Sequence, residues 1–171
     1  MKCESLDDMD SEFASYKMKA EAGDAIAQYN LGSCYSHGSG VTVDKAEAVK
    51  WYKRAAEAGD AKAQNNLGFC YENGSGVAVD KAEAFKWYQR AADAGNVNAQ
   101  CNLGSCYFNG SGVAVDKAEA VKWWKRAAEA GNANAQSALG HCYDNGYGVA
   151  VDKAESVKWY ERAADAGFVR I

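Results

Sequence analysis

Residues 38–59 of the chain read GSGVTVDKAEAVKWYKRAAEAG, and the same phrase returns with few changes from Gly74, Gly110 and Gly146. Successive copies start 36 residues apart. A fixed period of this length is the signature of a repeat array, in which each unit buries its apolar face against its neighbours. Each copy holds a turn glycine, a short loop, a helix pattern and a second turn glycine. The stretch therefore predicts an array of short helical units.

Four full units fit this period, at residues 24–59, 60–95, 96–131 and 132–167. Before them, residues 1–23 make an N-terminal tail and a lone capping helix, because residues 13–23 align with residues 49–59 of the first unit. Residues 168–171 are left as a C-terminal tail. Terminal units of a solenoid are expected to be atypical, since one side has no neighbour. We expect one solenoid domain overall.

Glycines and capping residues mark the ends of the predicted helices, because the chain has no proline. Each unit begins with Asp or Asn directly after a glycine, the pattern of a helix-ending glycine followed by the N-cap of the next helix. In the first unit we expect one helix from about residue 25 to 37 and a second one after Asp44. Asp44 and Glu47 match a capping box, with Asp in the usual Ser or Thr place.

Each predicted helix has one apolar face. At 100° per residue, Leu31, Cys34 and Tyr35 share a face of the first helix with Ala27. Gly32 lies close by, where the missing side chain is expected to let a neighbouring backbone approach. The second helix carries a broad apolar arc of Val49, Tyr52, Ala55 and Ala56. Neither face is buried within one unit, so stacking of helix pairs must cover both.

These residues resemble the Sel-1-like repeat family, relatives of the tetratricopeptide repeat. The first unit carries the family phrase as Ala27, Leu31, Gly32, Tyr35, Gly38, Gly40, Val41, Asp44, Ala48, Trp51, Tyr52, Ala55, Ala56 and Gly59. A tetratricopeptide array repeats at 34 residues instead. The resemblance implies an all-α, right-handed α-solenoid (superhelix) of four 36-residue helix-turn-helix repeats with an N-terminal half repeat. It also implies scaffold or adaptor work in assembling protein complexes, with a structural spacer in a larger scaffold as the alternative.

Charge and hydropathy exclude other kinds of partner. The net charge is −4 and the pI about 5.2, with both signs interspersed. Nucleic-acid binding requires clustered Lys and Arg, so no nucleic-acid partner is expected. No apolar run approaches the ~20 residues that span a bilayer, and the first ten residues lack the apolar segment of a secretory signal. A cytoplasmic protein without a membrane partner is expected.

The six cysteines are predicted to be reduced. Four of them recur at one phase, in the apolar face of each first helix: Cys34, Cys70, Cys106 and Cys142. Equivalent positions on packed helices lie roughly 8–10 Å apart or more, too far for a disulfide. Cys3 and Cys101 have no periodic partner, and Cys101 is expected to be exposed and reactive. Disulfide-bridged helix pairs, implied by the cysteine-rich relatives, are the alternative.

No catalytic, cofactor or metal site stands out. The chain has no Cys-x-x-Cys, and the spacing Cys34-x-x-His37 occurs once, so no metal is expected. A helix rather than a strand precedes the glycine-rich loops, which argues against phosphate binding and leaves Gly38 and Gly40 as turn residues. Penicillin-interacting activity, linked with the cysteine-rich relatives, is a remote alternative, because the Ser-x-x-Lys, Ser-Asp-Asn and Lys-Thr-Gly signatures are absent. We expect no enzyme and no cofactor.

Four tryptophans also recur at one phase: Trp51, Trp87, Trp123 and Trp159. We expect them to wedge between adjacent helix pairs. A stacking ladder for aromatic or sugar ligands is the alternative.

The positions at which the four copies differ most fall on one stripe of the first helices. They are the third, sixth, tenth and thirteenth of each unit, about 180° from the apolar face. In related superhelices these helices line the concave groove, where Asn side chains can bind a peptide backbone and aromatic residues can anchor side chains. The alternative is an exposed stripe that drifts without a ligand. The candidate groove residues are Ile26, Tyr29, Asn30, Ser33, Lys62, Asn65, Asn66, Phe69, Glu72, Asn98, Cys101, Asn102, Ser105, Phe108, Asn134, Ser137, His141 and Asp144.

The last unit has no following unit in this sequence. Its second helix is expected to expose apolar surface around Trp159 and Tyr160, to which Phe168, Val169 and Ile171 add. Exposed apolar patches mark interaction or self-association sites. We expect the tail to pack back over this end; end-to-end self-association is the alternative.

Overall fold

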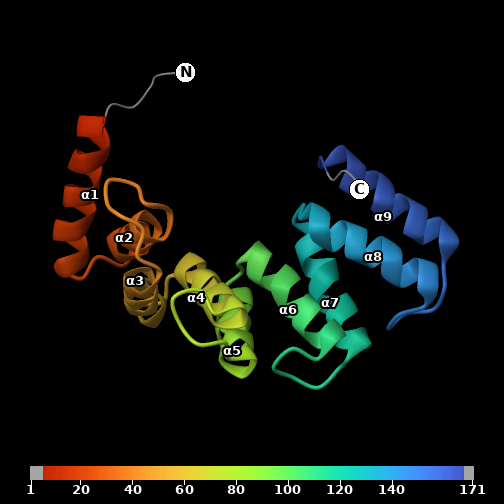
Figure 1. Ribbon diagram of the computed structural model, residues 1–171. Coiled ribbons are helices and arrows are strands. Elements are labelled where there is room, and N and C mark those ends of the chain that lie inside the picture. The colour runs from red at the N-terminus through yellow and green to blue at the C-terminus, as the bar shows by residue number, and fades with distance from the viewer. Residues whose placement is uncertain (1–5, 168–171) are drawn as a thin grey trace. The chain divides into compact units, whose positions relative to one another are not determined.

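The computed structural model of the protein describes the backbone of residues 6–167 and the side chains of residues 11–167. Within these residues all regular structure is helical (Figure 1). A lone helix comes first and begins at Leu6, before the stretch 13–23 that aligns with the first unit. Four helix pairs follow it, so the predicted all-α repeat architecture is confirmed. The helices are α1 (Leu6–Glu21), α2 (Ala25–His37), α3 (Lys45–Glu57), α4 (Ala61–Asn73), α5 (Lys81–Asp93), α6 (Val97–Asn109), α7 (Lys117–Glu129), α8 (Ala133–Asn145) and α9 (Lys153–Asp165).

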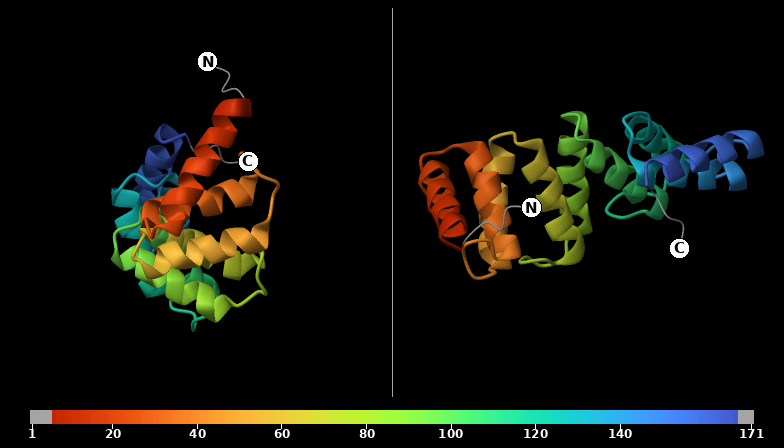
Figure 2. Two further views of the ribbon diagram at one scale, coloured as in Figure 1. Left: turned by 90° about the vertical axis from the view of Figure 1, so that its left-hand side faces the viewer. Right: turned by 90° about the horizontal axis from the view of Figure 1, so that it is seen from above.

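The helices gather into two compact units, Met1–Trp87 and Tyr88–Ile171. We call them the N-terminal and the C-terminal unit; α5 begins in the first and ends in the second. In the N-terminal unit α1 packs on α2, α2 on α3 and α3 on α4. In the C-terminal unit α6 packs on α7, α7 on α8 and α8 on α9. Figure 2 shows the antiparallel pair α2 and α3 side by side, joined by one loop at the end of α2.

The predicted apolar faces form the core. Leu31, Leu67, Leu103 and Leu139 have no exposed surface, and the periodic cysteines and alanines around them are buried. Three of the four periodic tryptophans, Trp51, Trp87 and Trp159, lie between helix pairs, as expected. Trp51 joins α3 to Ala20 of α1 and Leu31 of α2, and Trp159 joins α9 to residues of α7 and α8. An arginine one turn later in the helix lies over the tryptophan ring. In α3 the Arg54 guanidinium is 4.8 Å from the centre of the Trp51 ring.

Local hydrogen bonds end the helices where the glycines and caps predicted. Gly38 adopts φ 80° and donates its N–H to Cys34. In the tight turn between repeats, the Asp60 carboxylate accepts from the Ala63 N–H at 2.7 Å. Asp44 likewise accepts from the Glu47 N–H at 2.9 Å, which confirms the N-cap.

The second half of the predicted capping box is wrong. The Glu47 carboxylate does not bond back to Asp44; it pairs with Lys50 at 2.7 Å, one turn further along α3. The Asp44 N–H instead donates to the Tyr35 carbonyl, 2.9 Å away at the end of α2. Because the Tyr35 carbonyl satisfies this donor, the Glu47 carboxylate is left for a surface ion pair.

Two sets of glycines make room for close packing. Gly76 and Gly148, in the loops, adopt positive φ as turn residues, but a Cβ on either would also overlap the backbone of the preceding repeat at Lys45 or Lys117. At Gly32 the expected close approach of a backbone is present, because a Cβ there would lie 3.2 Å from the Ala48 carbonyl oxygen. The Tyr52 ring comes closer still, at 2.7 Å, and the sequence did not predict this contact.

Polar side chains also link neighbouring repeats, and sequence reasoning missed them. The buried Gln64 donates its amide N–H to the Ala56 carbonyl at 3.1 Å, from α4 to the end of α3. Gln28, Gln100 and Gln136 make the same bond to Ala20, Ala92 and Ala128. The sequence signal for these bonds is a glutamine that recurs at one position of every repeat, beside the apolar face.

The apolar surface expected at α9 lies on other residues. Trp159 is buried, at 5% exposure, and Tyr160 is half-buried, because both contact α8. Val157 is the exposed residue, at 54%, whereas its equivalents Val49 and Val121 are at 8% and 6%. The expectations for Cys3, Phe168, Val169 and Ile171 lie outside the described residues. None of the described helices is long and apolar enough to cross a lipid bilayer.

Candidate binding surface

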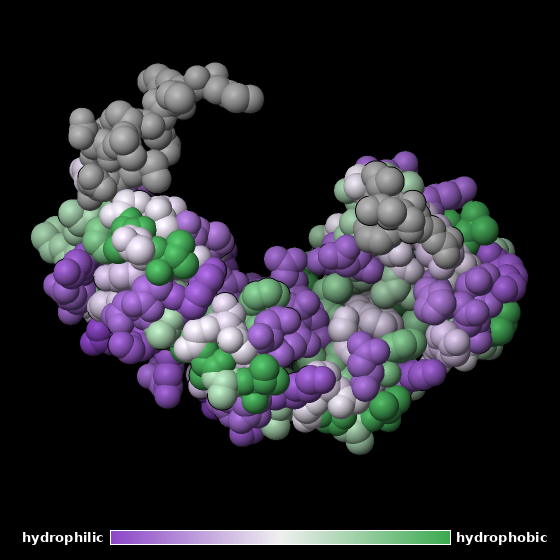
Figure 3. Space-filling model, viewed as in Figure 1, coloured by the Kyte–Doolittle hydropathy of each residue, from purple (hydrophilic) through white to green (hydrophobic). Residues whose placement is uncertain are grey.

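The stripe of varying residues lies on α2 and α4 in the N-terminal unit and on α6 and α8 in the C-terminal unit. None of its members is buried, in contrast to the constant face of the same helices. The exposed members are Ile26, Lys62, Phe69, Asn98, Asn134 and His141. The half-buried members are Tyr29, Asn30, Ser33, Asn65, Asn66, Glu72, Cys101, Asn102, Ser105, Phe108, Ser137 and Asp144. Figure 3 shows hydrophilic and apolar side chains interspersed on the viewed face.

In the N-terminal unit, the side chain of Tyr52 extends from α3 to the residues of this stripe on α2. Gly32 leaves space for its ring, which lies 5.9 Å from the ring of Tyr29. Burial raises the pKa of Tyr52, and hydrogen bonding with the side chains of Asn66, Ser36 and Ser33 opposes that rise. The hydroxyl of this buried second-helix residue therefore lies among polar side chains of α2 and α4.

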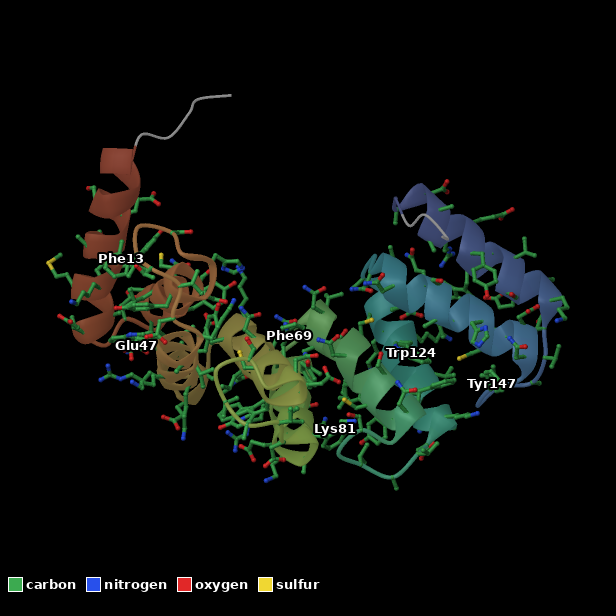
Figure 4. The ribbon with its side chains drawn as sticks, viewed as in Figure 1. Phe13, Glu47, Phe69, Lys81, Trp124 and Tyr147 are labelled. Carbon is green, nitrogen blue, oxygen red and sulfur yellow. The ribbon has the colours of Figure 1, made fainter. Side chains whose placement is uncertain are left out.

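A pocket of about 280 Å³ opens at this place. Its walls come from the end of α2, the start of α3 and the exposed side of α4. Phe69, labelled on α4 in Figure 4, is 54% exposed. The lining residues are Ser36, His37, Lys45, Tyr52, Asn66, Phe69, Cys70 and Ser75.

Lys45 is the charged group of this pocket. Its ammonium donates to the carbonyl and hydroxyl oxygens of Ser36 and pairs with no carboxylate of the described chain. Burial raises the pKa of the Cys70 thiol, and the Lys45 charge partly opposes this, which places the ammonium close to α4. The pocket thus combines one cation with hydroxyl and amide groups.

In the C-terminal unit, aromatic side chains occupy the equivalent place. The ring of Phe108 lies 5.3 Å from that of Trp124 and 5.7 Å from that of Tyr147, and the His141 ring lies 5.4 Å from that of Tyr147, tilted by 58°. The Lys117 ammonium, equivalent to Lys45, lies 4.1 Å above the Tyr147 ring. Figure 4 shows Trp124 on α7 and Tyr147 in the loop after α8.

The expectation that Cys101 is exposed and reactive is wrong. Its side chain is half-buried against the core of the C-terminal unit, and burial raises the pKa of the thiol to about 11. Its carbonyl accepts from the Trp124 indole N–H at 3.0 Å. The four periodic cysteines are buried and free, as predicted.

Sequence reasoning found the stripe but missed Lys45, Tyr52 and Ser75, which come from other elements. In the sequence Lys45 and Tyr52 resemble structural residues. Every repeat has a lysine at the position of Lys45 and an aromatic residue at the position of Tyr52. Among the described residues no three His, Cys, Asp or Glu side chains gather as a metal-binding group. The surface offers hydrogen bonding, one cation and aromatic contact.

Helix pairs packed in order, with recurring caps and glycines, define the class of α-solenoid repeat proteins. A family model of the Sel1 repeat matches residues 25–60, 61–96, 97–132 and 133–168. The chain therefore belongs to the Sel1 repeat family. Proteins of this family generally serve as protein-interaction scaffolds and are typically non-enzymatic.

Solved structures agree with this assignment. A protective antigen of uropathogenic Escherichia coli with an SLR fold is 45% identical, at a TM-score of 0.88, over 91% of this chain and 33% of its own length. A Sel1 repeat protein from Oxalobacter formigenes is 38% identical, at a TM-score of 0.87, over 92% of this chain and 65% of its own length. Cysteine rich protein B of Helicobacter pylori, 22% identical over 78% of this chain and 96% of its own, shares the fold at a TM-score of 0.61. The chain spans less than two thirds of the first two proteins. No curated protein gives a significant match.

Proposed function

We propose that the chain binds a peptide or protein partner along the stripe of its first helices. The observation that carries this proposal is the exposure of bulky apolar side chains on that stripe. Ile26 is 67% exposed and Phe69 54%, although the constant residues of the same helices are buried. Large apolar and aromatic side chains surrounded by polar groups are the usual anchors of protein interfaces. A spacer would not need them at the varying positions.

The polar members of the stripe suit an extended peptide. Asn30 and Asn66 are half-buried beside the two anchors, and an Asn side chain offers both donors and an acceptor to a peptide backbone. Asn30 and Ile26 also line a second pocket, of about 170 Å³, together with Tyr16 of α1. In the C-terminal unit, Asn98, Asn134 and His141 are exposed at the corresponding positions of α6 and α8.

Selection of displayed peptides on the full chain, followed by affinity measurement, tests this function. Ile26→Ser and Phe69→Ser are expected to weaken the selected peptides about tenfold or more, as loss of an interface anchor does. Met18→Ser and Val157→Ser are matched controls, because these residues are equally exposed, at 67% and 54%, but lie on α1 and α9. If all four variants bind alike, or if no peptide is selected, the stripe is not a binding surface and the chain is better described as a spacer.

We also propose a reducing, cytoplasmic location. The support is that Cys34, Cys70, Cys106 and Cys142 are buried free thiols, placed as small apolar side chains. Mass mapping under non-reducing conditions of protein taken from its own cells is expected to find them reduced. Two or more disulfides would overturn this location.

A further inference from the structure

We propose that the pocket between α2, α3 and α4 binds a carboxylate group of an acidic peptide. The inference rests on the proposed function and gives the ligand class of the N-terminal unit. Its starting point is a cavity of about 280 Å³ that holds Lys45, Tyr52 and Asn66. A carboxylate accepts hydrogen bonds and donates none, so it requires a site made of donors. The Lys45 ammonium and the Asn66 amide supply them, and the Tyr52 hydroxyl, which is hydrogen bonded with Asn66, borders the cavity.

The charge of Lys45 is available for a ligand. Its only described partners are the two oxygens of Ser36, which are neutral. Charge-assisted hydrogen bonds are shorter and stronger than neutral ones, so a carboxylate is a better partner for this ammonium than Ser36 is. The exposed ring of Phe69 stands at the same pocket, where it can contact an apolar residue next to the acidic one.

In the last repeat, the lysine equivalent to Lys45 binds a carboxylate. Lys153 has the phase of Lys45, and Asp144 has the phase of Ser36. There the ammonium donates to the Asp144 carbonyl at 2.8 Å, as Lys45 does to that of Ser36, and it also pairs with the Asp144 carboxylate at 2.7 Å. The chain therefore supplies the carboxylate in repeat 4, whereas in repeat 1 the serine leaves its place to a ligand.

In the C-terminal unit, aromatic side chains occupy the position that corresponds to this pocket. Phe108 and Tyr147 stand where Ser36 and Ser75 line the pocket, and the Lys117 ammonium lies over both rings, at 5.1 and 4.1 Å. These two differences between the copies thus fall on one place in the fold. We infer that the two units differ in ligand, with the acidic group bound by the N-terminal one.

Titration of the full chain with short peptides, followed by NMR, tests the proposal. The probes are acetyl-Phe-Glu-amide, acetyl-Phe-Gln-amide and acetyl-Phe-Gln with a free carboxyl end. We expect the acidic amide to shift the signals of Lys45 and Asn66 and to bind about tenfold better than the neutral one. A preference for the free acid over both amides would assign the site to a terminal carboxylate instead of a side chain. Equal binding of all three probes would overturn the proposal.

Two variants with matched controls sharpen the test. Lys45→Gln is expected to remove the preference for acidic probes, whereas Lys153→Gln leaves it intact. Ser36→Asp reproduces the repeat 4 pair, so it should close the site from within and abolish acidic binding in a chain that folds normally by circular dichroism. Unchanged acidic binding in Ser36→Asp would contradict the proposal. If displayed peptides still depend on Ile26 but show no acidic preference, this inference fails and the proposed function stands.

Discussion

A glycine inside a helix usually costs stability relative to alanine, by roughly 0.5–1 kcal/mol. Gly140 nevertheless stands in the middle of α8, where a Cβ would lie 2.8 Å from the ring of Tyr160. Overpacking of this kind costs about 1–3 kcal/mol, more than the gain in helix propensity. We expect Gly140→Ala to lower the free energy of unfolding by about 1–2 kcal/mol in urea denaturation. In a Tyr160→Leu background the same change should be neutral or stabilising. An equal loss in both backgrounds would mean that the ring is not the cause.

The thiols of Cys101 and Cys142 make the stability of the folded chain fall at high pH. Burial raises the pKa of Cys101 and of Cys142 from 9.0 to about 11, so the folded state keeps protons that the unfolded chain loses near pH 9. Their contribution to stability is therefore present below pH 9 and is lost as the pH rises towards 11. We expect the free energy of unfolding to fall over this range. In the double variant Cys101→Ala and Cys142→Ala the fall should be shallower; an identical pH profile would contradict this origin.

At the scale of elements, a glutamine joins each first helix to the helix before it, and it is buried in three of the four repeats. The amide N–H of Gln136 donates to Ala128 at 3.1 Å, but its Oε1 has no partner among the described residues. Gln136→Met removes the donor and the unmatched acceptor together, so its cost should stay within about 1 kcal/mol. Gln136→Glu places a carboxylate against a carbonyl oxygen, and we expect a loss of at least about 2 kcal/mol at pH 7. Because burial raises the pKa of such a group, acidification should recover this loss. A pH-independent loss would contradict the account.

The elements themselves could be predicted from the sequence because their signals are local. Asp44 caps a helix through a residue three positions away, and Gly38 ends one through its own φ, so both follow from the sequence. The ring that fills the space beside Gly32 comes from another helix, 20 positions along, and no periodicity identifies it. The pocket depends on still more distant parts, since Lys45 and Ser75 belong to different repeats. The burial of Cys101 had no sequence signal, because its phase carries polar residues in other copies.

At the scale of the whole molecule, one apolar face has no repeat packed on it in the described chain. Val157 is 54% exposed, and Ala164 beside it on α9 is exposed too, although Ala56 and Ala128 at the same phase are 2% exposed. We predict that deletion of residues 168–171 lowers the melting temperature and raises self-association. Val157→Ser in the shortened chain should restore the monomer in sedimentation velocity. An unchanged monomer with an unchanged melting temperature would leave the tail without a role.

The pocket of the N-terminal unit is built from residues of two successive repeats. Ser36 and Lys45 belong to one 36-residue copy, whereas Asn66 and Ser75 belong to the next. Unequal crossing-over between near-identical copies would add or remove whole copies, and each exchange at a copy boundary would split this site into halves. Loss of copies 2 and 3, for example, would set Lys45 opposite His141 and Tyr147. Because the N-cap at each boundary and the glutamine bond across it recur in every copy, we expect such a recombinant to fold and to place other side chains around the pocket.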